Sequence, residues 1–323
     1  MQLARRRFLR LAAGAAALPT MPRITRAQTY PTRPVRIVVG FPAGLAPDLI
    51  ARLVGQALSE RLAQPVVVEN RPGAGSNIGA GVVAKAPPDG YTLLMAVPTN
   101  TISHTLYPNL GFDFLRDIAP VAGVARSVFI LVVNPAVPAA TVPELIAYAK
   151  TNPGKINLAT PGIGSVPHVF GEMLKMMAGL DMQHVPYRGN IFPDLLSGQV
   201  QASFVTIASS AGYIHEGKLR ALGVTTAARA PALPDVPAIG EFVPGYEASS
   251  WYGVGAPSGT PAAIIAKLER EIDAVLSDEK MKTRFVGMGI DPMFMMSAEF
   301  AKFIVDEAEK WGKVVKFAGI KPA

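Results

Sequence analysis

The sequence predicts an α/β protein with two domains, and three observations lead to that prediction. Short apolar runs such as Val35-Arg36-Ile37-Val38-Val39 alternate with stretches whose apolar residues recur at helical spacing, as Leu49, Leu53 and Leu58 do. Strands that alternate with amphipathic helices imply right-handed βαβ units and a parallel sheet. The length of 323 residues leaves room for a large core in each of two domains. Half of the residues are hydrophobic and 17% are charged, which excludes a disordered chain and a coiled coil.

The first set of predicted elements begins at residue 35 and ends near residue 97. Apolar periodicity defines each of these elements, and glycine, proline or asparagine marks each turn between them. In chain order the set comprises a strand at 35–39, a loop at 40–44, a helix at 48–61, a strand at 66–69, a turn at 70–75, a helix at 77–86 and a strand at 92–97.

A second set begins near Ser127, and a mainly helical section closes the chain. The second set comprises strands at 129–133, 156–159, 183–187 and 200–207, with helices at 142–151 and 167–178. From 219–225 onward the pattern changes to proline-rich connections at Pro231, Pro234, Pro237 and Pro244. The last section comprises a strand at 251–256 and helices at 261–276 and 298–318. We expect these last helices to cover the sheet of the first domain.

The positive charge of the chain belongs to its N-terminal segment. The whole chain carries 31 Lys and Arg against 24 Asp and Glu, a net charge of +7. Residues 1–27 hold six arginines and no acid, so 25 basic against 24 acidic residues remain, a net charge of +1. A surface that follows nucleic-acid phosphates is therefore not indicated.

The same N-terminal segment has the pattern of an export signal. Arg5-Arg6-Arg7-Phe8-Leu9-Arg10 resembles the twin-arginine motif, and the apolar run at 11–18 is too short to span a bilayer. Thr25 and Ala27 place small residues at the −3 and −1 positions, which predicts cleavage after Ala27. An ordinary Sec signal with an accidental arginine pair is the alternative. Either route predicts a periplasmic protein without a later membrane-spanning segment, in a compartment that holds little ATP or NAD.

Few side chains in the sequence offer catalysis or metal binding. There are no cysteines, and the four histidines (His104, His168, His184 and His215) lack metal-ligand spacing, which excludes a structural zinc site and a cysteine nucleophile. No GxSxG elbow is present, so a serine hydrolase is not expected. The glycines at 73–79 imitate a dinucleotide fingerprint, but their spacing is wrong, and we interpret the segment as a structural turn. We expect no metal, no cofactor and no catalytic residue.

Three loops that contain glycine are better candidates for contact with a ligand. The loops at 41–44, 160–165 and 187–190 each follow a predicted strand and precede a helix. In open α/β sheets, ligands bind beyond the carboxyl ends of the strands, where the first N–H groups of each helix are unpaired and favour an anion. Most α/β proteins have such loops, so each loop alone is weak evidence.

Motifs along the whole chain resemble one known family. The matching segments include Tyr30-Pro31-x-Arg33-Pro34, Val38 to Gly44 with Asp48, Glu69 to Gly79, Pro88 to Leu94, Val185 to Gly189, Gly198-Gln199-Val200, Leu233 to Pro237, Pro244 to Glu247 and Trp311 to Val315. In this order they resemble the periplasmic substrate-binding proteins of tripartite tricarboxylate transporters, the Bug or TctC-type receptors.

The resemblance implies a type II periplasmic-binding-protein-like fold, in which two hinged domains each hold a mostly parallel sheet flanked by helices. Residues 28–126 plus 226–323 would form domain 1, and residues 127–225 would form domain 2. The implied function is that of a non-catalytic receptor, which closes around a small carboxylate and presents it to one large and one small integral-membrane subunit. Two alternatives are a soluble sensor that feeds a histidine kinase and an exported α/β enzyme that acts on carboxylates.

The resemblance also implies a set of ligand-binding residues. They are Phe41, Ala43, Gly44, Asp48 and Thr99 in domain 1, with Thr160, Ser165, His168, Tyr187, Arg188, Gly189 and Asn190 in domain 2. Backbone amides would hold the carboxylate and Arg188 would be secondary, whereas Asp48 is expected to be structural or to pair with an ammonium group. Leu45-Ala46-Pro47 replaces the polar residues usual in the family, which predicts a ligand larger or more aromatic than a citrate-like acid.

Overall fold

The structure is a computed structural model that describes residues 30–107 and 109–322. The predicted export signal at 1–27 lies outside the described residues. Residues 33–323 form one compact unit, and the fold described below is the fold of that unit. Among the described residues, no helix is both long and apolar enough to cross a bilayer.

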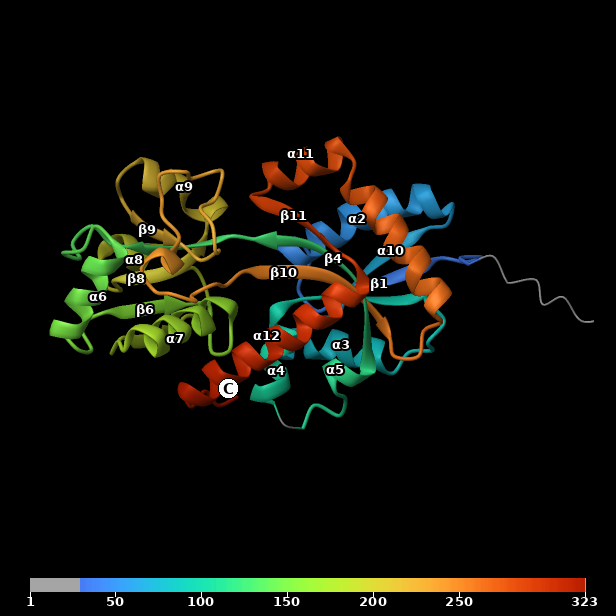
Figure 1. The fold of residues 1–323 in the computed structure, drawn as a ribbon, viewed down its shortest axis with the longest axis horizontal. Helices are drawn as coiled ribbons and strands as arrows, with labels where there is room; N and C mark the ends of the chain where they lie inside the picture. Colours follow the sequence, from blue (N-terminus) through green and yellow to red (C-terminus); the bar gives the residue numbers. More distant parts are fainter. Residues whose placement is uncertain (1–29, 108, 323) are drawn as a thin grey trace, which may run out of the picture. The chain divides into compact units, whose positions relative to one another are not determined.

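The first sheet contains six strands from both ends of the chain (Figure 1). Its order is β11-β4-β10-β3-β1-β2. The parallel pairs β1–β2 and β1–β3 lie at one side, and the pairs β3–β10, β10–β4 and β4–β11 are antiparallel. The strands are β1 (Val35–Val39), β2 (Val66–Asn70), β3 (Thr92–Ala96), β4 (Ile118–Ser127), β10 (Ser250–Pro257) and β11 (Ile290–Met295).

The second sheet contains five strands from the middle of the chain in the order β7-β6-β8-β5-β9. Strand β6 pairs in parallel with β7 and β8, whereas β5 is antiparallel to β8 and β9. The chain enters this sheet from β4 through Val128 and returns to the first sheet between β9 and β10. The strands are β5 (Phe129–Val133), β6 (Asn157–Thr160), β7 (Gln183–Pro186), β8 (Ala202–Thr206) and β9 (Arg220–Val224).

The predicted α/β class with two sheets is confirmed, but the description of the sheets as mostly parallel was wrong. Both sheets are mixed, because β4, β5, β9, β10 and β11 pair antiparallel with their neighbours. Strands β4, β9 and β11 were not predicted from the sequence. In β4, Pro120 and Gly123 interrupt the apolar pattern, and the pairing of β4 with β10 is irregular around Gly123. The division into domains at residues 126 and 226 stays a prediction.

The helices that flank the first sheet come from both ends of the chain. Helix α2 packs against α10, and α12 packs against α4 and β4 of this sheet and against α7 beside the second sheet (Figure 1). The helices here are α2 (Ala46–Leu62), α3 (Asn77–Ala84), α4 (Pro98–Leu106), α5 (Phe114–Asp117), α10 (Ala262–Leu276), α11 (Glu279–Gly287) and α12 (Ser297–Phe317). Those of the middle segment are α6 (Val142–Thr151), α7 (Val166–Ala178), α8 (Phe192–Ser197) and α9 (Ile207–His215).

The last helix joins two hydrophobic cores. Phe300 meets Trp251 edge to face at 5.6 Å in the first core, and Trp311 stacks on Phe170 at 5.5 Å in the second. The buried Glu307 accepts hydrogen bonds from the indole nitrogens of Trp251 and Trp311, at 3.0 and 2.8 Å. The expectation that this helix covers the first sheet is therefore met, and the helix also completes the second core.

Candidate functional site

The loop after β1 is held in shape by Asp48, near the start of α2. Asp48 is 1% exposed, and its carboxylate accepts hydrogen bonds from the Gly44 amide and the Asn70 side chain, each at 2.9 Å. It also forms an ion pair with Arg52 at 2.9 Å, and Asn70 donates a further bond to the Phe41 carbonyl at 3.0 Å. Asp48 therefore fixes the loop, in agreement with the structural role expected of it.

These contacts also determine the charge of Asp48. Burial raises the pKa of the carboxyl, but hydrogen bonds from Arg52, Gly44 and Asn70 lower it by more, and the net pKa lies below its ordinary value. The carboxylate is thus ionised at neutral pH, and the adjacent Arg52 offsets its charge. Phe41 is half-buried, whereas Ala43 and Gly44 are exposed.

The turn that follows β2 has a strained backbone. Residues 73–76 all have positive φ, at 130°, 47°, 60° and 83°, although Ala74 and Ser76 carry side chains. The left-handed conformation costs roughly 1–2 kcal/mol for a residue with a Cβ. Gly40, at the end of β1, packs so closely on this turn that a Cβ there would overlap Ser76. The turn therefore lies against the carboxyl end of β1, and strained backbone of this kind gathers at functional sites.

Two buried hydroxyls beside this turn have no hydrogen-bond partner within the described chain. They are Ser76 Oγ and Thr99 Oγ1, in residues that are 1% and 9% exposed. Gly75 lies next to α4, since a Cβ there would be 3.9 Å from Thr99 Cβ and 3.8 Å from Ser103 Oγ. Asn77 closes the group by donating to Ser103 Oγ at 2.8 Å. Because buried hydroxyls are normally paired, these two are candidates for contact with a ligand.

Of this cluster, only Thr99 was predicted from the sequence as a site residue. Ser76 and Asn77 lie in the glycine tract at 73–79, which was interpreted as a structural turn, and no sequence motif marked Ser103. The structure places that turn beside the ends of β1 and β3, where a ligand of an α/β sheet binds.

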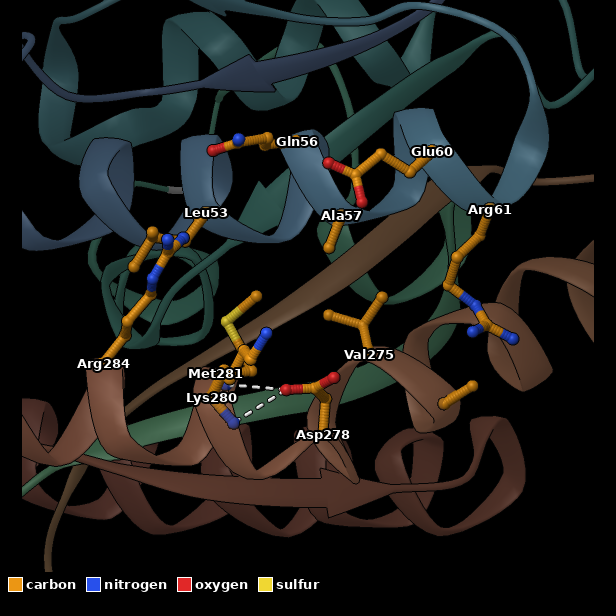
Figure 2. A pocket seen from close by; sticks show the side chains of 11 residues that line it. Leu53, Gln56, Ala57, Glu60, Arg61, Val275, Asp278, Lys280, Met281 and Arg284 are labelled. Carbon is orange, nitrogen blue, oxygen red and sulfur yellow. Dashed lines mark hydrogen bonds between the residues drawn. The ribbon is translucent and has the colours of Figure 1, made fainter.

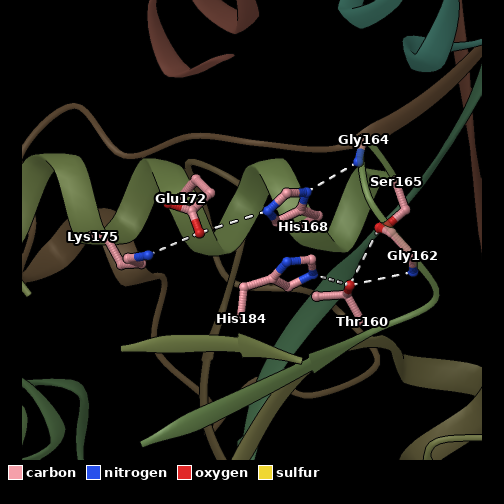
Figure 3. A network of polar contacts seen from close by, with 8 residues as sticks. All are labelled: Thr160, Gly162, Gly164, Ser165, His168, Glu172, Lys175 and His184. Atoms are coloured by element: carbon pink, nitrogen blue, oxygen red, sulfur yellow. Dashed lines mark hydrogen bonds and ion pairs between the residues drawn. The ribbon is translucent and has the colours of Figure 1, made fainter. Parts of the chain in front are cut away.

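The loop after β6 has its polar side chains occupied (Figure 3). Thr160 Oγ1 lies 2.6 Å from His184 Nε2, and Ser165 Oγ donates to the Gly162 carbonyl at 2.7 Å. The Gly164 amide donates to His168 Nδ1 at 3.0 Å. Neutral His168 must then carry its proton on Nε2, which faces Glu172 Oε1 at 3.7 Å. Thr160, Ser165 and His168 therefore hold the loop rather than present free groups.

A buried network extends this loop along α7. The rings of His168 and His184 stack at 3.6 Å, and Glu172 pairs with Lys175 at 2.9 Å. Burial lowers the pKa of His184 to about 4, and the neighbouring His168 adds to that shift. Burial raises the pKa of Glu172, but hydrogen bonds from His168 and Lys175 outweigh it, so the net pKa is lowered. Glu172 is therefore a buried carboxylate stabilised by its partners.

The loop after β7 has two engaged polar side chains and one free one. The Tyr187 hydroxyl donates to Asp194 at 2.6 Å, a bond that raises the pKa of Tyr187 to about 12. Asn190 accepts from the Phe192 amide at 3.1 Å. Arg188 and Gly189 are exposed, and the Arg188 guanidinium has no partner among the described residues. Arg188 is therefore the one cation of this loop that a ligand could still reach.

The structure contains a hollow lined by both sheets, and none of the predicted site residues lines it. It measures about 310 Å³ and lies between the first turn of α2, the end of β4, the β8–α9 junction and the turn after α11. Its lining residues are Ala46, Leu49, Ser127, Thr206, Ala208, Met288, Gly289 and Ile290.

A second cavity, of about 260 Å³, lies between α2, α10 and α11 (Figure 2). Its wall is charged, with Glu60, Arg61, Lys280 and Arg284 projecting from the helices, and Asp278 caps the start of α11 by accepting from the Lys280 and Met281 amides. This cavity reaches the last turn of α2, whereas the loop that Asp48 holds lies at its first turn. The described residues contain no cluster of acidic and histidine side chains that could hold a metal ion.

The fold and the loops together define a class, the solute-binding proteins of the periplasmic type. Residues 50–320 match the model of the tripartite tricarboxylate transporter family receptor. The chain is 35% identical over 300 residues to protein BugT of Bordetella pertussis, which covers 91% of this chain and 92% of that protein. It therefore belongs to this receptor family, and the resemblance drawn from the motifs is confirmed.

Solved structures show the same relationship. R. palustris Rpa4515 with adipate is 36% identical with a TM-score of 0.78, covering 91% of this chain and all of that one. MatC (Rpa3494) from Rhodopseudomonas palustris with bound malate is 30% identical with a TM-score of 0.73, covering 88% of this chain and all of that one.

Proposed function

We propose that this protein is a periplasmic receptor that binds a small carboxylate and delivers it to a tripartite transporter. Two related structures in the family hold adipate and malate, which are both carboxylates. The observation that carries the proposal to this chain is the pair of buried hydroxyls without partners, Ser76 Oγ and Thr99 Oγ1, beside the ends of β1 and β3.

The chemistry of this cluster favours an anion. The two hydroxyls can donate hydrogen bonds, and they lie at the starts of α3 and α4, where the positive end of each helix dipole attracts an anion. Asp48 would repel an anion if it were free, but Arg52 and the Gly44 amide already bind its carboxylate. Arg188 would add an exposed and therefore weak attraction.

Removal of the hydroxyls tests the proposal. A carboxylate is first found in a thermal-shift screen of aliphatic and aromatic acids, and its Kd is then measured by calorimetry for Ser76→Ala, Thr99→Val and the double variant. Each hydrogen bond to a charged group contributes about 1.5–3 kcal/mol, so each single variant should bind roughly ten- to a hundredfold more weakly. The carboxamide of the same compound should bind the wild-type protein more weakly than the acid does. On the variants, the acid and its carboxamide should bind about equally weakly.

A matched control is Thr92→Val. Thr92 is 8% exposed and lies at the opposite end of β3, so this variant should keep the wild-type Kd. Equal affinity for the acid and its amide would contradict the proposed ligand class. If the double variant bound the acid with wild-type affinity, the ligand would bind at another site.

The receptor role has its own test. We expect the bound ligand to be recovered unchanged by mass spectrometry, and its uptake into cells to require both this protein and the two integral-membrane subunits, one large and one small. A converted ligand would support an exported enzyme instead. Kinase signalling without uptake would support a sensor.

Export is tested by replacing Arg5 and Arg6 with lysine in the full-length chain. Precursor should then accumulate in the cytoplasm if the twin-arginine route is used. Normal processing of the variant would indicate the Sec route.

A further inference from the structure

The hollow of about 310 Å³ at the start of α2 differs from the hydroxyl cluster in the chemistry of its wall. No charged side chain lines it. The residues that line it are mostly small or apolar, and Leu49 is 39% exposed. An exposed leucine in a concave wall favours an apolar occupant, since burying it removes hydrocarbon surface from water.

The two hydroxyls in the wall of the hollow are already bonded within the protein. Ser127 Oγ lies 3.2 Å from the Tyr252 hydroxyl. Thr206 Oγ1 donates to Ser209 Oγ at 2.9 Å and accepts from the Ser209 amide at 3.3 Å. With these groups satisfied, the surface left for an occupant comes mainly from Ala46, Leu49, Ala208, Met288 and Ile290.

The hollow adjoins the loop that leads from the hydroxyl cluster. Gly40 packs on Ser76 at one end of that loop, and Ala46 lines the hollow at the other end. Between them the loop folds back, because the Gly44 amide donates to Asp48 at 2.9 Å. The hydroxyl cluster and the hollow therefore lie at the two ends of one short loop.

We propose that this hollow binds the hydrocarbon part of the ligand, so that the protein selects carboxylates with an apolar chain or ring over compact hydroxy acids. The inference rests on the proposed function and names its ligand class. The volume suffices, since an apolar cavity of about 150 Å³ already holds benzene. On the far wall, a Cβ at Gly289 would lie 2.9 Å from Ala208 Cβ, so close contact closes that side.

The test is a series of unbranched monocarboxylates from acetate to octanoate, with benzoate and malate for comparison. Calorimetry on the wild-type protein should give a Kd that falls about fourfold for each added methylene until the hollow is full. Benzoate should bind more tightly than malate.

Two variants test whether the hollow causes the dependence of the Kd on chain length. Ala208→Met fills the hollow and should weaken octanoate at least tenfold while leaving acetate within twofold of wild type. Leu49→Gln, at a half-exposed position that tolerates a polar side chain, should weaken octanoate roughly tenfold. The control is Val305→Gln, at a helix position on α12 that is 44% exposed and outside the hollow, which should change no Kd.

The outcomes separate this inference from the proposed function. If short acids bind and the Kd does not depend on chain length, the hollow does not hold the hydrocarbon, although the carboxylate receptor stands. The same conclusion follows if malate binds more tightly than every acid of the series, or if both variants keep the wild-type Kd for octanoate. If no acid of any length binds, the proposed function itself is wrong.

Discussion

The turn after β2 and the loop after β6 both lead from a parallel strand into a helix, yet they use their polar groups in different ways. Beside the β2 turn, Ser76 and Thr99 have buried hydroxyls without a partner in the described chain. Along the β6 loop, Thr160 is bonded to His184, and the Gly164 amide is bonded to His168. One region leaves hydrogen-bonding capacity open, and the other uses it to fix its own backbone.

This difference has an energetic consequence. A buried polar group without a partner costs about 1–3 kcal/mol, and each residue with a Cβ in the left-handed region adds roughly 1–2 kcal/mol. The β2 turn has both features, so it lowers stability in favour of binding. The β6 loop has a satisfied network and should contribute to stability and less to affinity. Substitutions along the β6 loop should therefore mainly change stability, whereas substitutions beside the β2 turn should also change ligand affinity.

The largest expected effect is on stability, from Glu172→Gln in the buried network. The variant leaves Lys175 without its charged partner, and because breaking a buried pair costs 3–5 kcal/mol, we expect a loss of about 3 kcal/mol. Denaturant unfolding measures this loss, and ligand affinity should stay within a few-fold of wild type. Glu216→Gln, in an exposed pair with Lys218, should leave stability close to that of the wild type. Equal effects of the two variants would contradict a stabilising role of the network.

Next in size is Gly40→Ala in the β2 region. The added Cβ would overlap Ser76, and overpacking of this kind costs about 1–3 kcal/mol. Because the displaced residue carries one of the open hydroxyls, ligand affinity should fall with stability. Gly212→Ala, in α9, is the control, since a Cβ there meets nothing within 4 Å. If Gly40→Ala bound the ligand with wild-type affinity, Ser76 would not be part of the binding site.

The third prediction concerns pH and His184. Its folded pKa of about 4 lies below the ordinary 6.5, so between these values the unfolded chain binds a proton that the folded chain does not. Acidification from pH 6.5 to pH 4 should therefore remove about 1–2 kcal/mol of stability, a figure reduced because the ring is only half-buried. The measurement compares wild type with His184→Gln, which should lose less stability over this range. Parallel pH profiles would exclude a role of this histidine.

The smallest effect is expected from Arg188→Ala. The side chain is exposed and unpartnered in the described chain, so its attraction to an anion is screened by solvent and contributes about 0.2–1 kcal/mol. Calorimetry should show a Kd raised no more than roughly fivefold, with less difference from wild type at high salt. Lys155→Ala, another exposed cation beside the second sheet, should leave the Kd unchanged. Complete loss of binding in Arg188→Ala would mean that this cation, not the amides and hydroxyls, holds the ligand.

Much of the fold could be predicted because its signals are local. The strand at 35–39, the helix at 142–151 and the helix ending at residue 178 agree with β1, α6 and α7 within a residue or so. Strand β11 (Ile290–Met295) was missed because Asp291 and Pro292 break the alternation, and its pairing with β4 joins segments far apart in the chain. In the same way, the sequence could place Thr99 after β3, but it could not reveal that the hydroxyl of Thr99 has no partner.

By itself, the sequence determined the order of strands and helices, the position of the basic segment, and the motifs that mark the receptor family. Each of these depends on residues that are neighbours along the chain. Only the tertiary structure decided that both sheets are mixed, that His184 stacks on His168, that Gly40 packs on Ser76, and that Ala46 and Ala208 line one hollow. The physical reason is that a polar atom or an apolar surface is satisfied by whatever the fold places against it, and that neighbour comes from a distant part of the chain.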